Sequence, residues 1–159
     1  MGYGAKYEDD FYAWTQEQAS RLREAAASGA NLPLDWENLA EEIESMGRSD
    51  LNGLISHFER LIEHLLKLEI SPAANPRQGW KRSVVQQRLS VARLLRNSPS
   101  LKAKLSDALD DAWLGGRRLA ALGLVEDGVT GREVPQDRPY TADQLLDPDW
   151  WPANWHGLD

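Results

Sequence analysis

Residues 34–69, LDWENLAEEIESMGRSDLNGLISHFERLIEHLLKLE, decide the fold of this chain. Their apolar residues recur at intervals of three and four, the spacing that places side chains on one face of an α-helix. Asp35 is a favourable N-terminal cap, and Gly47 has the conformational freedom that ends a helix. We therefore predict two antiparallel helices over residues 36–46 and 50–70, joined by a short turn.

The same reading of spacing and caps extends to the rest of the chain. A first helical region covers residues 7–28; if Thr15 begins a capping box, its regular part starts at Gln16 and residues 7–14 form a separate turn or aromatic arm. Two more helices are predicted over residues 78–96 and 99–122.

Glycines interrupt the last of these long helices, and regular spacing is lost soon afterwards. Gly115 and Gly116 indicate a kink or a close contact with another helix. A short helix over residues 142–146, capped by Thr141, is predicted farther on. Three of the seven tryptophans lie in the last ten residues. We expect this C-terminal segment to pack back on the helices as an irregular wrap.

Taken together, these elements predict an all-α, single-domain bundle of about five helices with a Trp-rich C-terminal wrap. The length of 159 residues suits one domain with a hydrophobic core. No segment shows the apolar–polar alternation of a β-strand. Residues 1–6 precede the first periodic stretch, and we expect them to be flexible.

Composition excludes several classes of function. The chain has no cysteine, which rules out disulfides, zinc–thiolate sites and thiol catalysis. The net charge of −7 argues against binding to nucleic acid. No stretch has the roughly 18 apolar residues that cross a membrane, and no signal peptide is visible. We expect a cytoplasmic protein.

Short motifs in a fixed order resemble one bacterial family, the domain of unknown function 29. The motifs are Asp10–Thr15, Asn38–Gly47, His64–Lys67, Ser98–Leu101, Pro139–Thr141 and Gln144–Leu146. The resemblance extends from about Tyr7 to Pro152 and implies an all-helical, intracellular single domain. It implies no activity and supplies no catalytic or binding residues. Leu68 departs from the pattern, because an aromatic residue is expected after His64–Lys67.

Glutamates and histidines in residues 34–69 form the candidate metal or acid–base site. His57 and His64 are seven residues apart, so they lie on one side of a helix. In an antiparallel hairpin, Glu41 or Glu44 would approach them, as ligands do in metal-binding bundles. The Glu-x-x-His and His-Glu-x-x-His spacings are absent, however. The alternative is that the glutamates form a solvated face and the histidines lie at the edge of the core.

Basic residues are concentrated in the middle of the chain. Residues 70–106 contain eight lysines and arginines and no acidic residue. Arg82, Arg93 and Arg96 share one strip of the predicted helix and are the candidate anion-binding residues, which would suit phosphate or nucleic acid. The alternative is that this basic helix pairs with the acidic residues 7–50 inside one bundle.

The leading functional hypothesis is a non-enzymatic helical module that binds a protein, either another chain or itself. No nucleophile elbow, phosphate-binding glycine loop or dinucleotide fingerprint is present, and no cofactor is expected. The first alternative is a metal-binding or hydrolytic bundle that uses the Glu/His cluster. The second is nucleic-acid binding through the basic helix. The oligomeric state is left open by the sequence.

Overall fold

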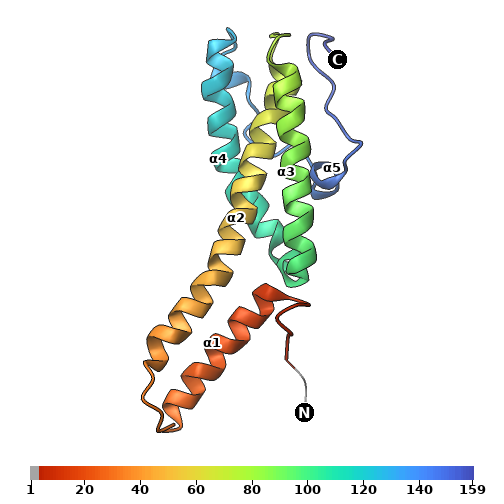
Figure 1. Cartoon of the computed structure of the whole chain (residues 1–159). Coiled ribbons are helices and arrows are strands. Elements are labelled where there is room, and N and C mark those ends of the chain that lie inside the picture. Colours follow the sequence, from red (N-terminus) through yellow and green to blue (C-terminus); the bar gives the residue numbers. More distant parts are fainter. Residues whose placement is uncertain (1–3) are drawn as a thin grey trace. The chain divides into compact units, whose positions relative to one another are not determined.

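The computed structural model describes residues 4–159, and in this range the chain is helical without any β-strand (Figure 1). This confirms the all-α fold of about five helices. The elements, in chain order, are α1 (Phe11–Ala27), α2 (Trp36–Ile70), α3 (Arg77–Asn97), the 3-10 helix η1 (Pro99–Lys104), α4 (Leu105–Glu126), the 3-10 helix η2 (Gly131–Glu133) and α5 (Ala142–Leu146).

The chain divides into two compact units. Unit 1 comprises Met1–Gly53 and Arg93–Lys104, and unit 2 comprises Leu54–Ala92 and Leu105–Asp159. Residues 1–3, half of the segment expected to be flexible, lie outside the described residues. Of the other half, Ala5 donates its backbone N–H to Glu17 at 2.7 Å. None of the helices in the described part of the chain is both long enough and apolar enough to cross a membrane.

The predicted hairpin over residues 34–69 is wrong, because α2 is one continuous helix of 35 residues. Gly47 has an ordinary helical backbone, and its role is to let α1 approach. A Cβ atom at this position would overlap the hydroxyl of Thr15 and lie 3.0 Å from Gln16 Nε2. The glycine is therefore explained by close helix packing within unit 1, and it does not end a helix.

In unit 1, helix α1 begins at Phe11, so the alternative start at Gln16 is also wrong. Asp10 is the N-terminal cap, and its carboxylate accepts a hydrogen bond from Ala13 N at 3.0 Å. The same carboxylate accepts two more, from Ser100 N at 2.7 Å and Ser100 Oγ at 2.8 Å. The half-buried carboxylate of Asp10 thus caps the start of α1 and attaches η1 to it. The start of the helix was missed because two of the three hydrogen bonds to Asp10 come from Ser100, 90 residues away.

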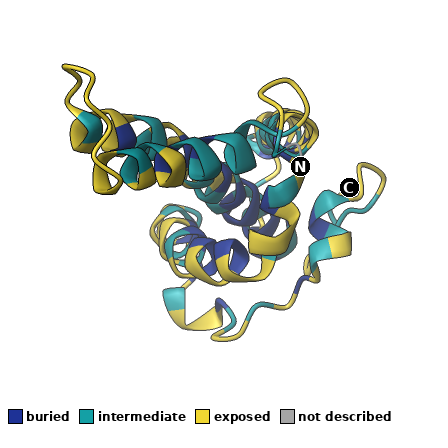
Figure 2. Ribbon diagram, turned by 90° about the horizontal axis from the view of Figure 1, so that it is seen from below, coloured by how far each residue is buried: buried dark blue, intermediate teal, exposed yellow. Residues whose placement is uncertain are grey.

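In unit 2, the second half of α2 supplies the centre of the core. Leu54, Phe58, Leu61, Ile62, Leu65 and Leu66 are fully buried there, at the spacing the sequence predicted. Figure 2 shows the buried residues as dark blue segments along the helices. Helix α4 packs closely against α2, because a Cβ at Gly116 would lie 2.8 Å from the backbone oxygen of Glu59. For Gly115 and Gly116 the sequence allowed a kink or a close contact with another helix, and the structure shows the close contact.

The C-terminal segment folds back on unit 2, as predicted. Helix α5 has the predicted bounds and a complete capping box between Thr141 and Gln144. Farther on, Trp155 N donates to the carbonyl oxygen of Glu69 at 2.8 Å. Asn154 Nδ2 donates to Leu68 O at 2.8 Å and to Ser71 O at 2.9 Å. These donors bind carbonyl groups in the last turn of α2, which the helix itself leaves unpaired, and at Ser71 just beyond its end.

Candidate protein-binding groove

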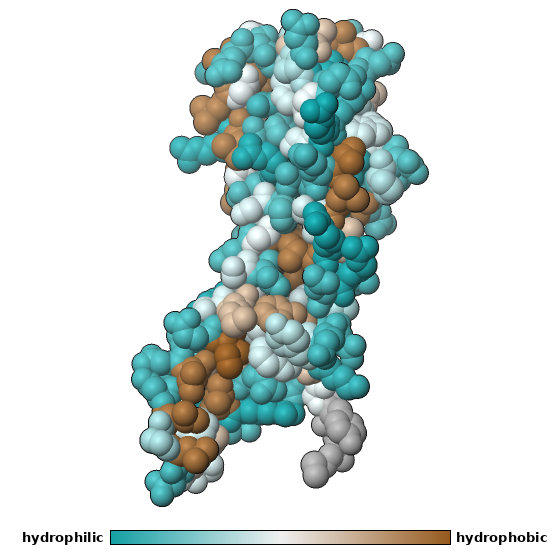
Figure 3. Space-filling model, viewed as in Figure 1, coloured by the Kyte–Doolittle hydropathy of each residue, from teal (hydrophilic) through white to brown (hydrophobic). Residues whose placement is uncertain are grey.

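An apolar groove with a volume of about 230 Å³ lies on unit 2 between α3 and the segment that begins with α5. Its lining consists of Val85, Arg88, Leu89, Ala92, Leu146 and Pro148. Val85 is 45% exposed and Leu89 is 59% exposed. Figure 3 shows a brown apolar area on the surface in the region where Figure 1 places α3 and α5. The groove therefore presents apolar walls to solvent.

The position of each residue on α3 follows from the helical repeat. Val84, Arg88 and Val91 recur at intervals of four and three and are buried. Val85 and Leu89 are each one residue farther along, which turns them by about 100° away from the core. A helix with apolar residues in both rows cannot bury them all against its own unit.

Arg88 forms the polar floor of the groove and is only 6% exposed. Its guanidinium donates hydrogen bonds to four carbonyl oxygens: Gln144 at 3.2 Å, Leu145 at 2.9 Å, Pro148 at 3.5 Å and Trp150 at 2.9 Å. It also lies 5.2 Å from the ring centroid of Trp151. Burial lowers the pKa of Arg88, opposed by the nearby Asp147. Even so, an arginine remains charged at neutral pH.

Charge is unevenly distributed around the groove. Helix α3 carries six basic residues and no acidic one. Arg82 is exposed beside Val85 and forms no ion pair with any of the described residues. Across the groove, Asp147 and Asp149 are exposed. One rim is therefore basic and the other acidic.

The two histidines of the predicted metal site have separate surroundings in unit 2. His57 Nδ1 is hydrogen-bonded to Gln87 Oε1 on α3 at 2.7 Å. The Nδ1 atom of His64 is buried and has no hydrogen-bond partner among the described residues. Burial lowers the pKa of His64, and it outweighs Glu63, which raises that pKa. These effects favour the neutral form of His64 relative to a histidine in water.

The two glutamates of that site lie in unit 1 and are paired with arginines. Arg23 Nη2 contacts Glu44 at 2.8 Å and Glu41 at 3.6 Å. Arg48 contacts the same two carboxylates. The hydrogen bond from Arg23 lowers the pKa of Glu44, and the same bond raises the pKa of Arg23. Both arginines belong to the acidic part of the chain, so these ion pairs are local to residues 23–48.

Because α2 is continuous, the arrangement that would bring glutamate and histidine together is absent. Glu41 and Glu44 belong to unit 1, and His57 and His64 belong to unit 2, so neither unit by itself contains the predicted cluster. Within residues 4–159 there is no group of three or more histidine, aspartate or glutamate side chains placed to hold a metal ion.

The predicted anion-binding residues are all exposed on α3. Arg82 belongs to unit 2, whereas Arg93 and Arg96 belong to unit 1. The prediction that they bind an anion together stays a prediction.

The structural role of Arg88 was not predicted from the sequence, because this residue is one of several positive charges in a basic run. The pattern Val84, Arg88, Val91 places its Cα on the buried side of the helix and was the available signal. A buried arginine needs several oxygen acceptors, and the groups that satisfy this one are backbone carbonyls, which no sequence pattern reveals.

The fold and the groove define an all-helical protein with an exposed apolar surface. The chain belongs to the family described as domain of unknown function DUF29, which matches residues 6–151. It is also similar to an α-helical protein of unknown function from Rhodospirillum rubrum, known from a crystal structure. The two share 31% sequence identity over 93% of each chain, with a TM-score of 0.75. No curated protein matches the chain. The resemblance drawn from the motifs is confirmed, and neither relative assigns a function.

Proposed function

We propose that the protein is a non-enzymatic interaction module whose groove between α3 and α5 binds an acidic amphipathic helix of a partner protein. The observation that supports this most directly is the groove itself, with Val85 and Leu89 exposed in its wall. Contiguous apolar surface rimmed by polar residues is characteristic of protein-binding sites.

The apolar lining provides the affinity in this proposal. A leucine-sized side chain that leaves water to fill such a groove contributes about 1.5 to 3 kcal/mol. Because the far wall is held in place by Arg88, the groove is formed before a partner arrives. A preformed site loses less conformational entropy on binding, which increases affinity further.

The charged rims provide the orientation. Arg82 and the other basic residues of α3 favour glutamate or aspartate on the side of the partner helix that faces α3. Asp147 and Asp149 disfavour acidic residues on the opposite side. A helix with its acidic residues on one flank of an apolar stripe fits both rims.

A protein partner fits this surface better than nucleic acid does. Nucleic acid would satisfy the basic side of α3, but it has no aliphatic side chain to fill an apolar groove. The net charge of −7 for the whole chain also repels a polyanion.

The test uses a fluorescein-labelled 16-residue helical peptide of leucine, alanine and glutamate, with leucines in one stripe and glutamates along one flank. Binding to the full-length protein is measured by fluorescence anisotropy at low salt. Leu89→Glu is expected to weaken binding at least about tenfold, since it places a charge in the apolar wall. Leu122→Glu is the matched control, because Leu122 is 65% exposed on α4 and lies outside the groove.

Four results overturn the proposal: no binding of the peptide, equal binding of a lysine-for-glutamate version, equal loss in both leucine variants, or tighter binding of a single-stranded oligonucleotide. Sedimentation analysis adds a fifth. A concentration-dependent dimer of the protein that Leu89→Glu abolishes would make a second copy the occupant of the groove in place of a different partner.

The proposal includes a location in the bacterial cytoplasm, which the absence of cysteine and the family resemblance support. Recovery of the native protein in a membrane or periplasmic fraction would contradict it.

A further inference from the structure

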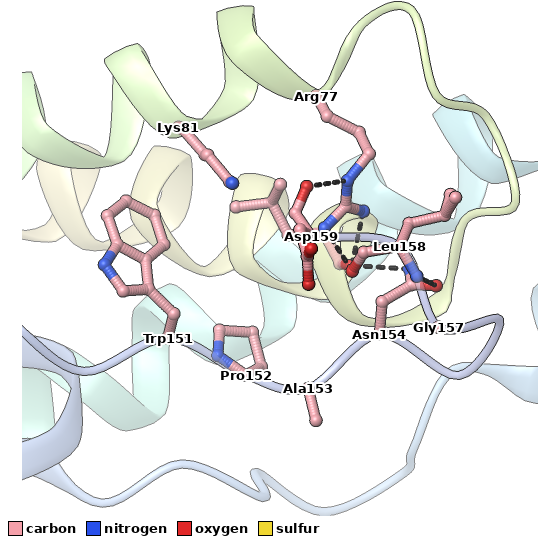
Figure 4. Close-up of a pocket in the computed structure, with 10 residues that line it drawn as sticks. Arg77, Lys81, Trp151, Pro152, Ala153, Asn154, Gly157, Leu158 and Asp159 are labelled. Atoms are coloured by element: carbon pink, nitrogen blue, oxygen red, sulfur yellow. Dashed lines mark hydrogen bonds between the residues drawn. The ribbon is translucent and has the colours of Figure 1, made fainter.

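Groups of both charges line a pocket of about 550 Å³ on unit 2, between α3 and residues 151–159. Arg77 and Lys81 supply its positive groups. Figure 4 shows Arg77 hydrogen-bonded there to a main-chain oxygen of Asp159, whose side chain lines the pocket as well. Because positive and negative groups are mixed, the charges of this pocket do not select one class of ligand.

Another pocket, about 360 Å³, lies on unit 1 and has a one-sided charge. Tyr7 and Glu8 come from the turn before α1, and Phe11 is the first residue of that helix. Asp50 belongs to α2 and Asn97 is the last residue of α3. These five residues form the lining, so two aromatic rings meet two carboxylates, and no described lysine or arginine lines the pocket.

Asp50 is a half-buried carboxylate whose charge is not compensated. Among the described residues it has neither an ion-pair nor a hydrogen-bond partner. Burial raises the pKa of Asp50, whereas a cation beside it, such as Arg93 or Arg96 of the same unit, would lower that pKa. The turn at residues 6–10 does not compensate the charge either, because it contains three acidic residues and one lysine. The pocket is therefore negative.

Tyr7 gives this pocket an aromatic wall that its neighbours restrain. The residue is 53% exposed, so its ring is accessible to a ligand. It forms T-shaped contacts with Phe11, at 5.4 Å between ring centroids, and with Trp14, at 4.9 Å. Phe11 and Trp14 are in turn stacked on each other. Contacts of this kind favour one orientation of the Tyr7 ring, beside the two carboxylates.

We propose that this pocket binds a guanidinium group, which stacks on Tyr7 and donates hydrogen bonds to Asp50. A guanidinium is planar and lies flat on an aromatic face. Its paired N–H donors match the two oxygens of a carboxylate, and Asp50 has no other donor among the described residues. An ammonium group matches less well, because it is compact, strongly hydrated and not planar.

The guanidinium group can belong to a free small molecule or to an arginine side chain of a partner, since the same chemistry recognises both. The site lies on unit 1 and the groove on unit 2. It therefore stands whether or not a helix binds in the groove.

The test is titration of the full-length, nitrogen-15-labelled protein with N-acetyl-arginine amide, followed by NMR chemical shifts at low ionic strength and neutral pH. N-acetyl-citrulline amide is the ligand control, because a neutral urea group of nearly the same shape replaces the guanidinium. N-acetyl-lysine amide tests whether any cation is sufficient. We expect a dissociation constant below about 5 mM for the arginine compound. Binding should be at least about tenfold weaker for citrulline and about threefold weaker for lysine.

Variants locate the binding in the pocket. Asp50→Asn is expected to weaken the arginine compound at least about fivefold, and Tyr7→Leu about threefold. Circular dichroism verifies that both variants are folded. Asp111→Asn is the matched control, because it removes the same charge at an exposed position outside the pocket. Neither this control nor the groove variant Leu89→Glu should change the dissociation constant.

The proposal is overturned if the arginine and citrulline compounds bind equally, if the lysine compound binds as tightly as the arginine compound, or if folded Asp50→Asn binds as the wild type does. An equal loss in Asp111→Asn would also overturn it. Two further probes distinguish the sources. Methylguanidine that binds as tightly as the arginine compound supports a free small molecule, and a capped alanine-arginine-alanine peptide that binds more tightly supports a partner protein. These readouts do not use the helical peptide, so their failure is distinguishable from failure of the proposed function.

Discussion

Replacement of Arg88 by methionine tests whether one buried arginine holds the C-terminal segment on unit 2. Methionine keeps most of the aliphatic volume and removes the guanidinium. The change eliminates hydrogen bonds to four carbonyl oxygens and the contact with Trp151. We expect amide hydrogen exchange over residues 141–156 to become faster, because this segment loses its attachment to α3.

The magnitude follows from the burial of the group. A hydrogen bond to a charged donor has a net value of about 1.5 to 3 kcal/mol, but four bonds to one guanidinium are not additive. Removal of one member of a buried charged arrangement costs about 3 to 5 kcal/mol, part of which reflects the groups left unpaired. The carbonyls here can regain water if the segment detaches, so we expect about 3 kcal/mol. In a chain of 159 residues this lowers the melting temperature by roughly 6 to 12 °C.

The assays are urea denaturation followed by circular dichroism and hydrogen exchange followed by mass spectrometry. Arg82→Met is the matched control on the same helix, because Arg82 is exposed and has no ion-pair partner among the described residues. It should change stability by less than about 0.5 kcal/mol. If Arg88→Met loses less than about 1 kcal/mol and exchange over residues 141–156 is unaltered, the four hydrogen bonds do not hold the segment.

Three further predictions test other parts of the fold. Gly116→Ala should destabilise the protein by about 1 to 3 kcal/mol, because its Cβ would lie 2.8 Å from a backbone oxygen. Gly79→Ala should stabilise it by roughly 0.5 kcal/mol or more, because nothing lies within 4 Å of the added atom. Urea denaturation measures both changes in the free energy of unfolding. Burial lowers the pKa of His64 in the folded state, so the stability that the neutral ring contributes is present above the unfolded value of about 6.5 and is lost as pH falls through the folded value. Denaturation at a series of pH values should therefore show a shallower loss of stability in His64→Leu than in the wild type. Asp10→Ala should cost about 2 kcal/mol in the same assay, since it removes a helix cap and two further hydrogen bonds, and a loss below about 0.5 kcal/mol would argue against that role.

The sequence was sufficient to predict those features in which the interacting residues are close together in the chain. Thr141 and Gln144 form a capping box three residues apart, and the bounds of α5 followed from it. The apolar repeat of residues 54–66 likewise gave the core of unit 2. Both features depend on contacts within one or two helical turns, which sequence spacing reports directly.

Gly47 shows why the helix boundary in α2 could not be predicted. A glycine between two periodic segments is compatible with a left-handed helix end or with a close approach of another helix. The deciding contact is Thr15, which lies 32 residues earlier in the chain. The candidate metal site depended on the same turn, because a hairpin at Gly47 was the arrangement that would have brought the glutamates to the histidines.

The groove could not be predicted from the sequence, for a related reason. One wall is a row of α3, and the other is Leu146 and Pro148, which belong to a segment more than 50 residues later. What joins the two walls is Arg88, whose acceptors are the carbonyl groups of whatever residues are present there. Any displacement of this segment must therefore break the hydrogen bonds of a buried arginine. The shape of the groove and the stability of the C-terminal wrap consequently depend on the same side chain.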